Sequence, residues 1–131
     1  MPWAQAKKGI HMRIMLVEDN TTFREAFKEQ LCGRFPLAII EEAENGGEAI
    51  QKITEPPPEI IFMDFSLPGE NGARLTQKIK AKYPNIHVAM LTSYDLPEYR
   101  QAAIQSGAER YFVKDSFFWN EVEGFIECHA A

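Results

Sequence analysis

Four apolar runs of this sequence are each followed by side chains that could do chemistry. The four groups are Glu18 with Asp19 after 14–17, Asp64 after 60–63, Thr92 after 86–91 and Lys114 after 111–113. If these runs are neighbouring parallel strands, three carboxylates, a hydroxyl and an ammonium meet at the carboxyl edge of one sheet. Open α/β sheets bind their ligands at that edge.

Three acids in one place favour a divalent cation. Like charges a few ångströms apart repel, and a hard cation such as Mg²⁺ relieves the repulsion. A carboxylate, Mg²⁺, a hydroxyl and an ammonium together suit phosphoryl transfer. The sequence contains no GxxxxGK[ST], GxGxxG or HExxH motif that would favour another chemistry. The histidines His11, His87 and His129 have no metal-ligand spacing, and we interpret His87 as a packing residue inside a strand.

Strand-like runs alternate with amphipathic patterns along the chain. The expected strands are about 12–18, 36–42, 59–64, 86–92 and 109–113, and the expected helices about 20–33, 46–54, 70–83, 96–106 and 116–129. This alternation predicts an α/β fold with a doubly wound, five-stranded parallel sheet and five helices. A flavodoxin-like strand order of 2-1-3-4-5 would bring the ends of the first and third strands side by side.

Composition and charge narrow the class of protein. The 131 residues, 45% of them hydrophobic and 25% charged, suit one domain, to which we assign residues 12–131. Residues 1–11 lie outside the pattern and are either a native extension or a remnant of cloning. A net charge of -5 argues against nucleic-acid binding by this domain, and no run is long enough for a membrane helix. Cys32 and Cys128 favour reduced structural thiols in a cytosolic protein, with a Cys32–Cys128 disulfide as the alternative.

The chain resembles the receiver domain of two-component response regulators from Met12 to about Cys128. The pieces that carry the resemblance are 17–20 (Val-Glu-Asp-Asn), 62–64 with 67–69 and Gly72, 91–93 (Leu-Thr-Ser), and 107–108 with 111–114. The Lys114-Asp115-Ser116 segment is similar to the subfamily that carries a C-terminal helix-turn-helix output domain. The sequence leaves open whether this is a stand-alone receiver or part of a longer regulator.

The resemblance implies a role for each residue at the predicted edge. Asp64 would accept a phosphoryl group from a sensor histidine kinase or a phosphotransfer protein. Asp19, Asp64 and the backbone carbonyl of Ser66 would bind Mg²⁺, or alternatively Mn²⁺, and Glu18 would act through a metal-bound water. Thr92 and Lys114 would contact phosphoryl oxygens, and Thr92 with Tyr111 would form the switch.

The same resemblance predicts a cytoplasmic signalling switch and not an enzyme. Phosphorylation would alter the face formed by the fourth helix, fifth strand and fifth helix, and would thereby control a partner, an output domain or homodimerisation. Its only catalysis would be its own phosphotransfer and slow autodephosphorylation, with Ser66 and Tyr94 flanking the path of water. Two alternatives remain: a small-molecule phosphatase or phosphotransferase that forms an aspartyl phosphate, and a phosphorylation-independent scaffold. Of the aromatic residues 117–119, we expect at least two to pack in the core.

Overall fold

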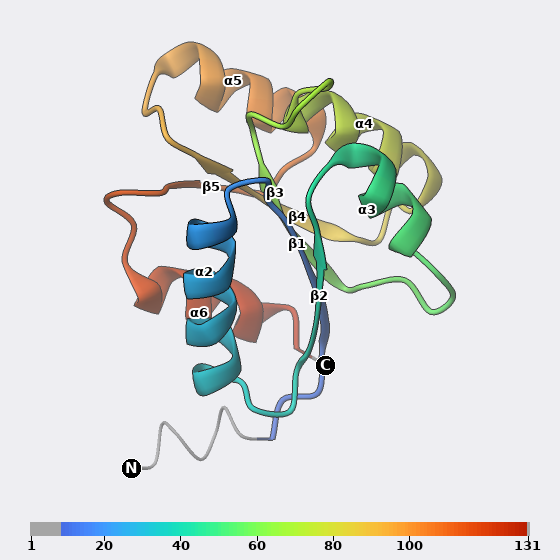
Figure 1. Ribbon diagram of the computed structural model, residues 1–131, viewed down its shortest axis with the longest axis vertical. Helices are drawn as coiled ribbons and strands as arrows, with labels where there is room; N and C mark the ends of the chain where they lie inside the picture. The colour runs from blue at the N-terminus through green and yellow to red at the C-terminus, as the bar shows by residue number, and fades with distance from the viewer. Residues whose placement is uncertain (1–8, 131) are drawn as a thin grey trace.

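The computed structural model describes residues 9–130, which form five parallel strands and five helices (Figure 1). In chain order the elements are β1 (Arg13–Val17), α2 (Thr21–Arg34), β2 (Ile39–Ala43), α3 (Gly46–Lys52), β3 (Ile60–Asp64), α4 (Gly72–Lys82), β4 (His87–Thr92), α5 (Pro97–Ser106), β5 (Arg110–Val113) and α6 (Trp119–Cys128). The strand order is β2-β1-β3-β4-β5, which confirms the predicted doubly wound sheet. Most of the predicted extension, 1–11, lies outside the described residues.

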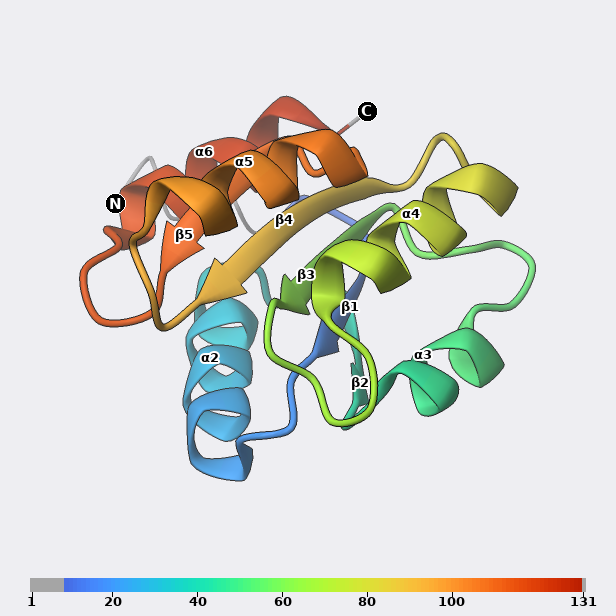
Figure 2. The same ribbon diagram turned by 90° about the horizontal axis from the view of Figure 1, so that it is seen from above.

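Helices cover both faces of the sheet (Figures 1 and 2). The face that bears Met15, Met63 and Met90 packs against α3, α4 and α5. The face that bears Leu16 and Phe62 packs against α2 and α6. Because side chains alternate between the faces of a strand, the apolar residues of β1, β3 and β4 supply both cores. Burial on both faces explains why these three strands read as continuous apolar runs in the sequence.

Side-chain caps fix where three helices begin. The Oδ1 atoms of Asn20, Asn45 and Asn71 accept hydrogen bonds from backbone N–H groups in the first turns of α2, α3 and α4, at 2.8–3.0 Å. These caps satisfy amides that lack partners within the helix. They start the helices directly beside the carboxyl ends of β1 and β2 and beside the loop that follows β3.

No helix of the described residues is long and apolar enough to span a membrane.

Several predicted boundaries were wrong by a few residues. The second strand begins at Ile39 and not at 36, because α2 extends to Arg34 and the backbone N–H of Phe35, whose ring is buried, donates to the carbonyl of Leu31 in the last turn. The last helix begins at Trp119 and not at 116, because residues 114–116 form a turn after β5. These errors do not move any residue of the predicted site.

The aromatic segment 117–119 divides between core and surface. Phe117 and Trp119 pack beside Phe27, with ring centroids 5.9 and 4.8 Å from its ring, whereas Phe118 is 67% exposed. This confirms the expectation that at least two of the three pack in the core.

Cys32 and Cys128 are free, exposed thiols, so the disulfide alternative was wrong.

Candidate functional site

The predicted site residues meet at the carboxyl edge of the sheet. Because β1, β3 and β4 are neighbours, Glu18 and Asp19 follow one strand while Asp64 and Thr92 end the next two. Carboxylate oxygens of Glu18, Asp19 and Asp64 all lie within 4.8 Å of one another. Glu18, Asp64 and Thr92 are buried, at 0–2% exposure, and Asp19 is exposed. The acid cluster therefore opens to solvent on the Asp19 side.

Lys114 compensates part of the negative charge. Its Nζ atom lies 2.6 Å from Oε1 of Glu18 and 3.2 Å from Oδ1 of Asp64. The same Asp64 oxygen accepts a hydrogen bond of 3.1 Å from the backbone N–H of Ser66. Burial alone would lower the pKa of Lys114, but its ion pairs outweigh burial and raise that pKa. The ammonium therefore stays charged between the two buried acids.

The carboxylates remain short of positive charge despite this ion pair. Burial, together with the nearby Glu18 carboxylate, raises the pKa of Asp64 to about 6. Loss of hydration and the neighbouring Asp64 also raise the pKa of Asp19. Burial first, and the neighbouring acid second, therefore disfavour the ionised forms of Asp19 and Asp64.

The donor set fits a divalent cation. Oε1 of Glu18 is buried without a well-directed hydrogen bond, even though the Lys114 ammonium lies 2.6 Å away. Carboxylate oxygens are ligands that Mg²⁺ accepts, together with waters and phosphate oxygens. The under-compensated charge of Glu18, Asp19 and Asp64 is therefore suited to such an ion.

Gly72 allows the chain to fold tightly behind Asp64. A Cβ atom at Gly72 would lie 2.1 Å from the carbonyl oxygen of Asp64, far inside contact distance. The backbone N–H of Gly72 donates to the carbonyl of Phe65 at 2.7 Å. Only glycine permits this approach. The start of α4 thus fixes the backbone of residues 64–66, including the Ser66 carbonyl that the resemblance assigned to the metal.

Thr92 and Tyr111 are linked through the backbone of Tyr94. Oγ1 of Thr92 accepts from the N–H of Tyr94 at 3.1 Å, and the Tyr111 hydroxyl donates to the carbonyl of Tyr94. The guanidinium of Arg100 lies 5.0 Å from the Tyr111 ring centroid. Tyr94 itself is 52% exposed, and its ring stacks on Tyr99 with centroids 5.5 Å apart. The two predicted switch residues therefore share one hydrogen-bonded loop.

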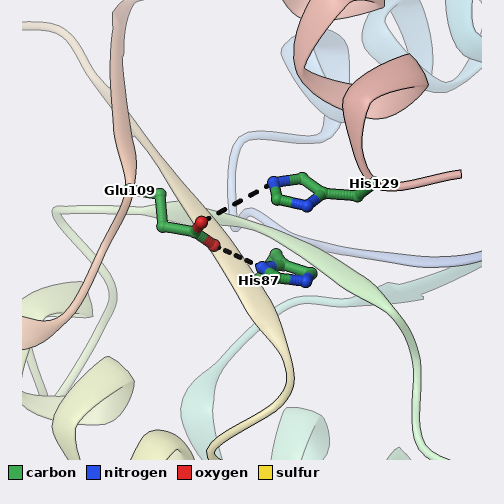
Figure 3. A group of neighbouring side chains, drawn as sticks. All are labelled: His87, Glu109 and His129. Atoms are coloured by element: carbon green, nitrogen blue, oxygen red, sulfur yellow. Dashed lines mark hydrogen bonds and ion pairs between the residues drawn. The ribbon is translucent and has the colours of Figure 1, made fainter.

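One sequence interpretation was wrong at the other end of the sheet. His87 is not a packing residue, because its ring is half-buried and faces Glu109 and His129 (Figure 3). Linear spacing could not reveal this group, since its three members are far apart in the chain. The only sequence signal was the position of His87 and Glu109 at the starts of two consecutive strands.

A doubly wound sheet with buried acids, a threonine and a lysine at its carboxyl edge is the architecture of a phosphoacceptor domain. The model of the response regulator receiver domain family matches residues 14–118. The chain therefore belongs to the receiver domains of two-component response regulators.

Individual relatives agree with this assignment. The chain is 34% identical over 106 residues to the oxygen regulatory protein NreC of Staphylococcus haemolyticus, a match that covers 80% of this chain and 49% of that protein. A LuxR-family two-component response regulator from Aurantimonas sp. SI85-9A1 is 29% identical, with a TM-score of 0.79 and coverage of 92% of this chain and 89% of that one. TrrA of Thermotoga maritima, solved in complex with Mg²⁺-BeF, is 29% identical, with a TM-score of 0.76 and coverage of 90% and 98%. The chain thus spans about half the length of the curated relatives it matches.

Proposed function

We propose that Asp64 is the phosphoacceptor of this receiver domain. The observation that carries the proposal is the Lys114 ammonium, which lies 3.2 Å from Asp64 at an edge that also holds Glu18, Asp19 and Thr92. A buried carboxylate beside a fixed cation and a hydroxyl can accept a phosphoryl group and hold its oxygens. Asp64 ends a strand, so the geometry of its side chain is set by the sheet.

The transfer is an in-line displacement. A carboxylate oxygen of Asp64 attacks the phosphorus of a phosphohistidine, a P–O bond forms, and the P–N bond breaks. The imidazole of the donor leaves with the electron pair and takes up a proton from solvent. Lys114 and the hydroxyl of Thr92 then contact the oxygens of the new acyl phosphate, where the negative charge lies.

The carboxylates of Asp19 and Asp64 and the carbonyl of Ser66 would hold Mg²⁺, and Glu18 would act through a water. When bound, the cation would neutralise negative charge on the phosphoryl oxygens. Mn²⁺ has similar ligand preferences and would substitute. The raised pKa values of Asp19 and Asp64 support this assignment, because burial and the neighbouring acid disfavour their ionised forms and a bound cation would favour them.

Phosphorylation would be read out by α5, β5 and α6. When Thr92 turns toward the phosphoryl group, Tyr94 loses the acceptor of its N–H, and Tyr111 loses a fixed partner. The ring of Tyr111 then moves and changes the adjoining surface. Such coupling is worth about 1–3 kcal/mol in switch proteins.

We further propose that the phosphodonor is a sensor histidine kinase or a phosphotransfer protein, and that the readout is homodimerisation or contact with an output domain. The similarity to LuxR-family regulators supports a longer regulator that binds DNA through a separate domain. Net negative charge argues against DNA binding by this domain itself.

Intact-protein mass spectrometry after exposure to acetyl phosphate tests the assignment. The parent chain should gain one phosphoryl group in the presence of Mg²⁺ and none in excess chelator. Asp64→Asn should gain none, because the amide is not a nucleophile. Asp115→Asn is the matched control, since Asp115 is exposed beside Lys114 and should leave labelling unchanged. Labelling of Asp64→Asn to the level of the parent would contradict the proposal.

A further inference from the structure

A second group of ligand-type side chains lies at the end of the sheet opposite Asp64. His87 is the first residue of β4, whereas Thr92 at its other end belongs to the phosphoacceptor site. Glu109 comes just before β5, and His129 follows α6. Figure 3 shows both imidazole rings directed at the Glu109 carboxylate. Three separate elements therefore deliver one side chain each to a single point.

The atoms of this group converge closely. Nδ1 of His87 lies 2.6 Å from Oε2 of Glu109, and Nε2 of His129 lies 3.6 Å from Oε1 of the same carboxylate. The two rings stack, with centroids 3.6 Å apart and planes inclined by 16°. At 3.6 Å the His129 nitrogen is too far for a proper hydrogen bond. Its position is therefore not explained by hydrogen bonding to Glu109 alone.

We propose that His87, Glu109 and His129 form a binding site for a borderline transition-metal cation, with Zn²⁺ as the reference ion. Two imidazole nitrogens and one carboxylate oxygen are a ligand set that Zn²⁺ uses in sites with an open fourth position. Partial exposure of the three side chains, at 35, 38 and 17%, leaves that position to water or to an external ligand.

The distances permit the coordination once the two imidazole rings reorient. Zn–N and Zn–O bonds of about 2.0–2.2 Å place tetrahedral ligand atoms about 3.2–3.6 Å apart. All candidate ligand atoms here lie within 4.8 Å of one another. The closest pair must separate by several tenths of an ångström, and the His129 contact already falls in the required range. The two imidazole planes, inclined by only 16°, must also turn apart to direct both lone pairs at one ion, and rotation about the side-chain bonds of His87 and His129 supplies this change.

The surroundings favour a cation at this point. His129 caps the C-terminal end of α6, where the helix dipole is negative and the last turn carries no basic residue. The ring of Phe125 packs edge-on against His129, with centroids 5.0 Å apart. Mg²⁺ prefers oxygen ligands, so the two ends of the sheet would select different ions.

A metal held here would join the end of α6 to β4 and β5. Two of these elements, α6 and β5, belong to the face that we propose to respond to phosphorylation. The metal would therefore hold α6 against the sheet at the end remote from Asp64.

Calorimetric titration of the chain with Zn²⁺, in buffer containing excess Mg²⁺ to occupy the acid cluster, tests the proposal. One equivalent of Zn²⁺ should bind, and the thermal midpoint should rise with Zn²⁺ concentration. His129→Gln and His87→Asn should each weaken binding by tenfold or more, and Co²⁺ should give visible d–d absorption that both variants lose. Thermal midpoints measured in chelator establish that the variants are folded.

Two variants serve as controls. His11→Gln removes an exposed imidazole that precedes β1 at the same end of the sheet, and Asp64→Asn alters the acid cluster. Both should bind Zn²⁺ as the parent does. The proposal is overturned if the parent shows no saturable binding at millimolar Zn²⁺, if the His87 and His129 variants retain parental affinity, or if the affinity falls instead in Asp64→Asn.

Discussion

At the scale of single residues, Asp64 combines a functional role with an energetic cost. Its pKa is about 6, above the ordinary value of 3.8, because burial and Glu18 disfavour the ionised form. The folded state therefore binds more protons than the unfolded chain between these values, and stability falls as the pH rises from about 4 to about 6.

Replacing this carboxylate should stabilise the domain in the absence of a divalent cation. The full shift corresponds to roughly 3 kcal/mol, and because water reaches the open edge we expect about 1–2 kcal/mol for Asp64→Asn at pH 7. Urea unfolding in chelator at pH 4.5 and pH 7 measures the difference, which should fall to roughly a third at the lower pH. If Asp64→Asn were less stable than the parent at pH 7, the cost assigned to the buried charge would be wrong. The control variant Asp115→Asn should have the stability of the parent at both pH values.

Tyr94 gives a second prediction at the residue scale. It lies two positions after Thr92, and its ring is supported by Tyr99, which in turn contacts Phe65 edge-on at 4.9 Å. We expect this ring to restrict water near the acyl phosphate, so that Tyr94→Ala loses its phosphoryl group about 3–10-fold faster than the parent. Decay of the phosphoprotein after removal of the donor, followed by mass spectrometry, gives both rates. Equal rates would mean that Tyr94 does not shield the site.

At the scale of elements, the approach of α4 to the end of β3 depends on Gly72. In Gly72→Ala the added methyl group would meet the Asp64 carbonyl, so the loop must shift and the variant should lose about 1–3 kcal/mol of stability. Phosphorylation by acetyl phosphate should slow as well, because residues 64–66 move. Gly33→Ala is the matched control: a Cβ atom there meets nothing within 4 Å, and the helix should become slightly more stable. Comparing the denaturant midpoints of Gly72→Ala and Gly33→Ala separates the steric effect of the added methyl group from its effect on helix propensity.

At the scale of the whole molecule, phosphorylation should act on one side of the sheet. The hydrogen bonds from Thr92 through Tyr94 to Tyr111 connect the site with α5 and β5, whereas β2 and α3 share no such link among the described contacts. Hydrogen exchange after phosphorylation should therefore change more in 92–113 than in 36–55. A uniform change, or none, would reject the switch and leave the phosphoacceptor assignment intact. The Asp64→Asn variant, exposed to the same phosphodonor, gives the hydrogen exchange that is unrelated to phosphorylation.

The amino-acid sequence alone predicted the fold class and the residues of the acid cluster, whereas the strand order was taken from the likeness to flavodoxin-like sheets and is confirmed by the structure. Apolar runs that end in Asp64, Thr92 and Lys114 carry this information locally, because parallel strands always present their carboxyl ends at one edge. The limits of strand β2 and helix α6 were less well predicted, since the packing of Phe35 and the turn at 114–116 decide them.

Only the tertiary structure decided which charges compensate one another and which histidines meet. The contact of Lys114 with both Glu18 and Asp64 depends on side-chain reach across the sheet, which sequence spacing does not specify. The same is true of His87 and His129, which are brought together by the return of α6 to the amino end of β4. Strand ends are aligned by backbone hydrogen bonds, whereas contacts between side chains of distant elements follow from how the helices pack.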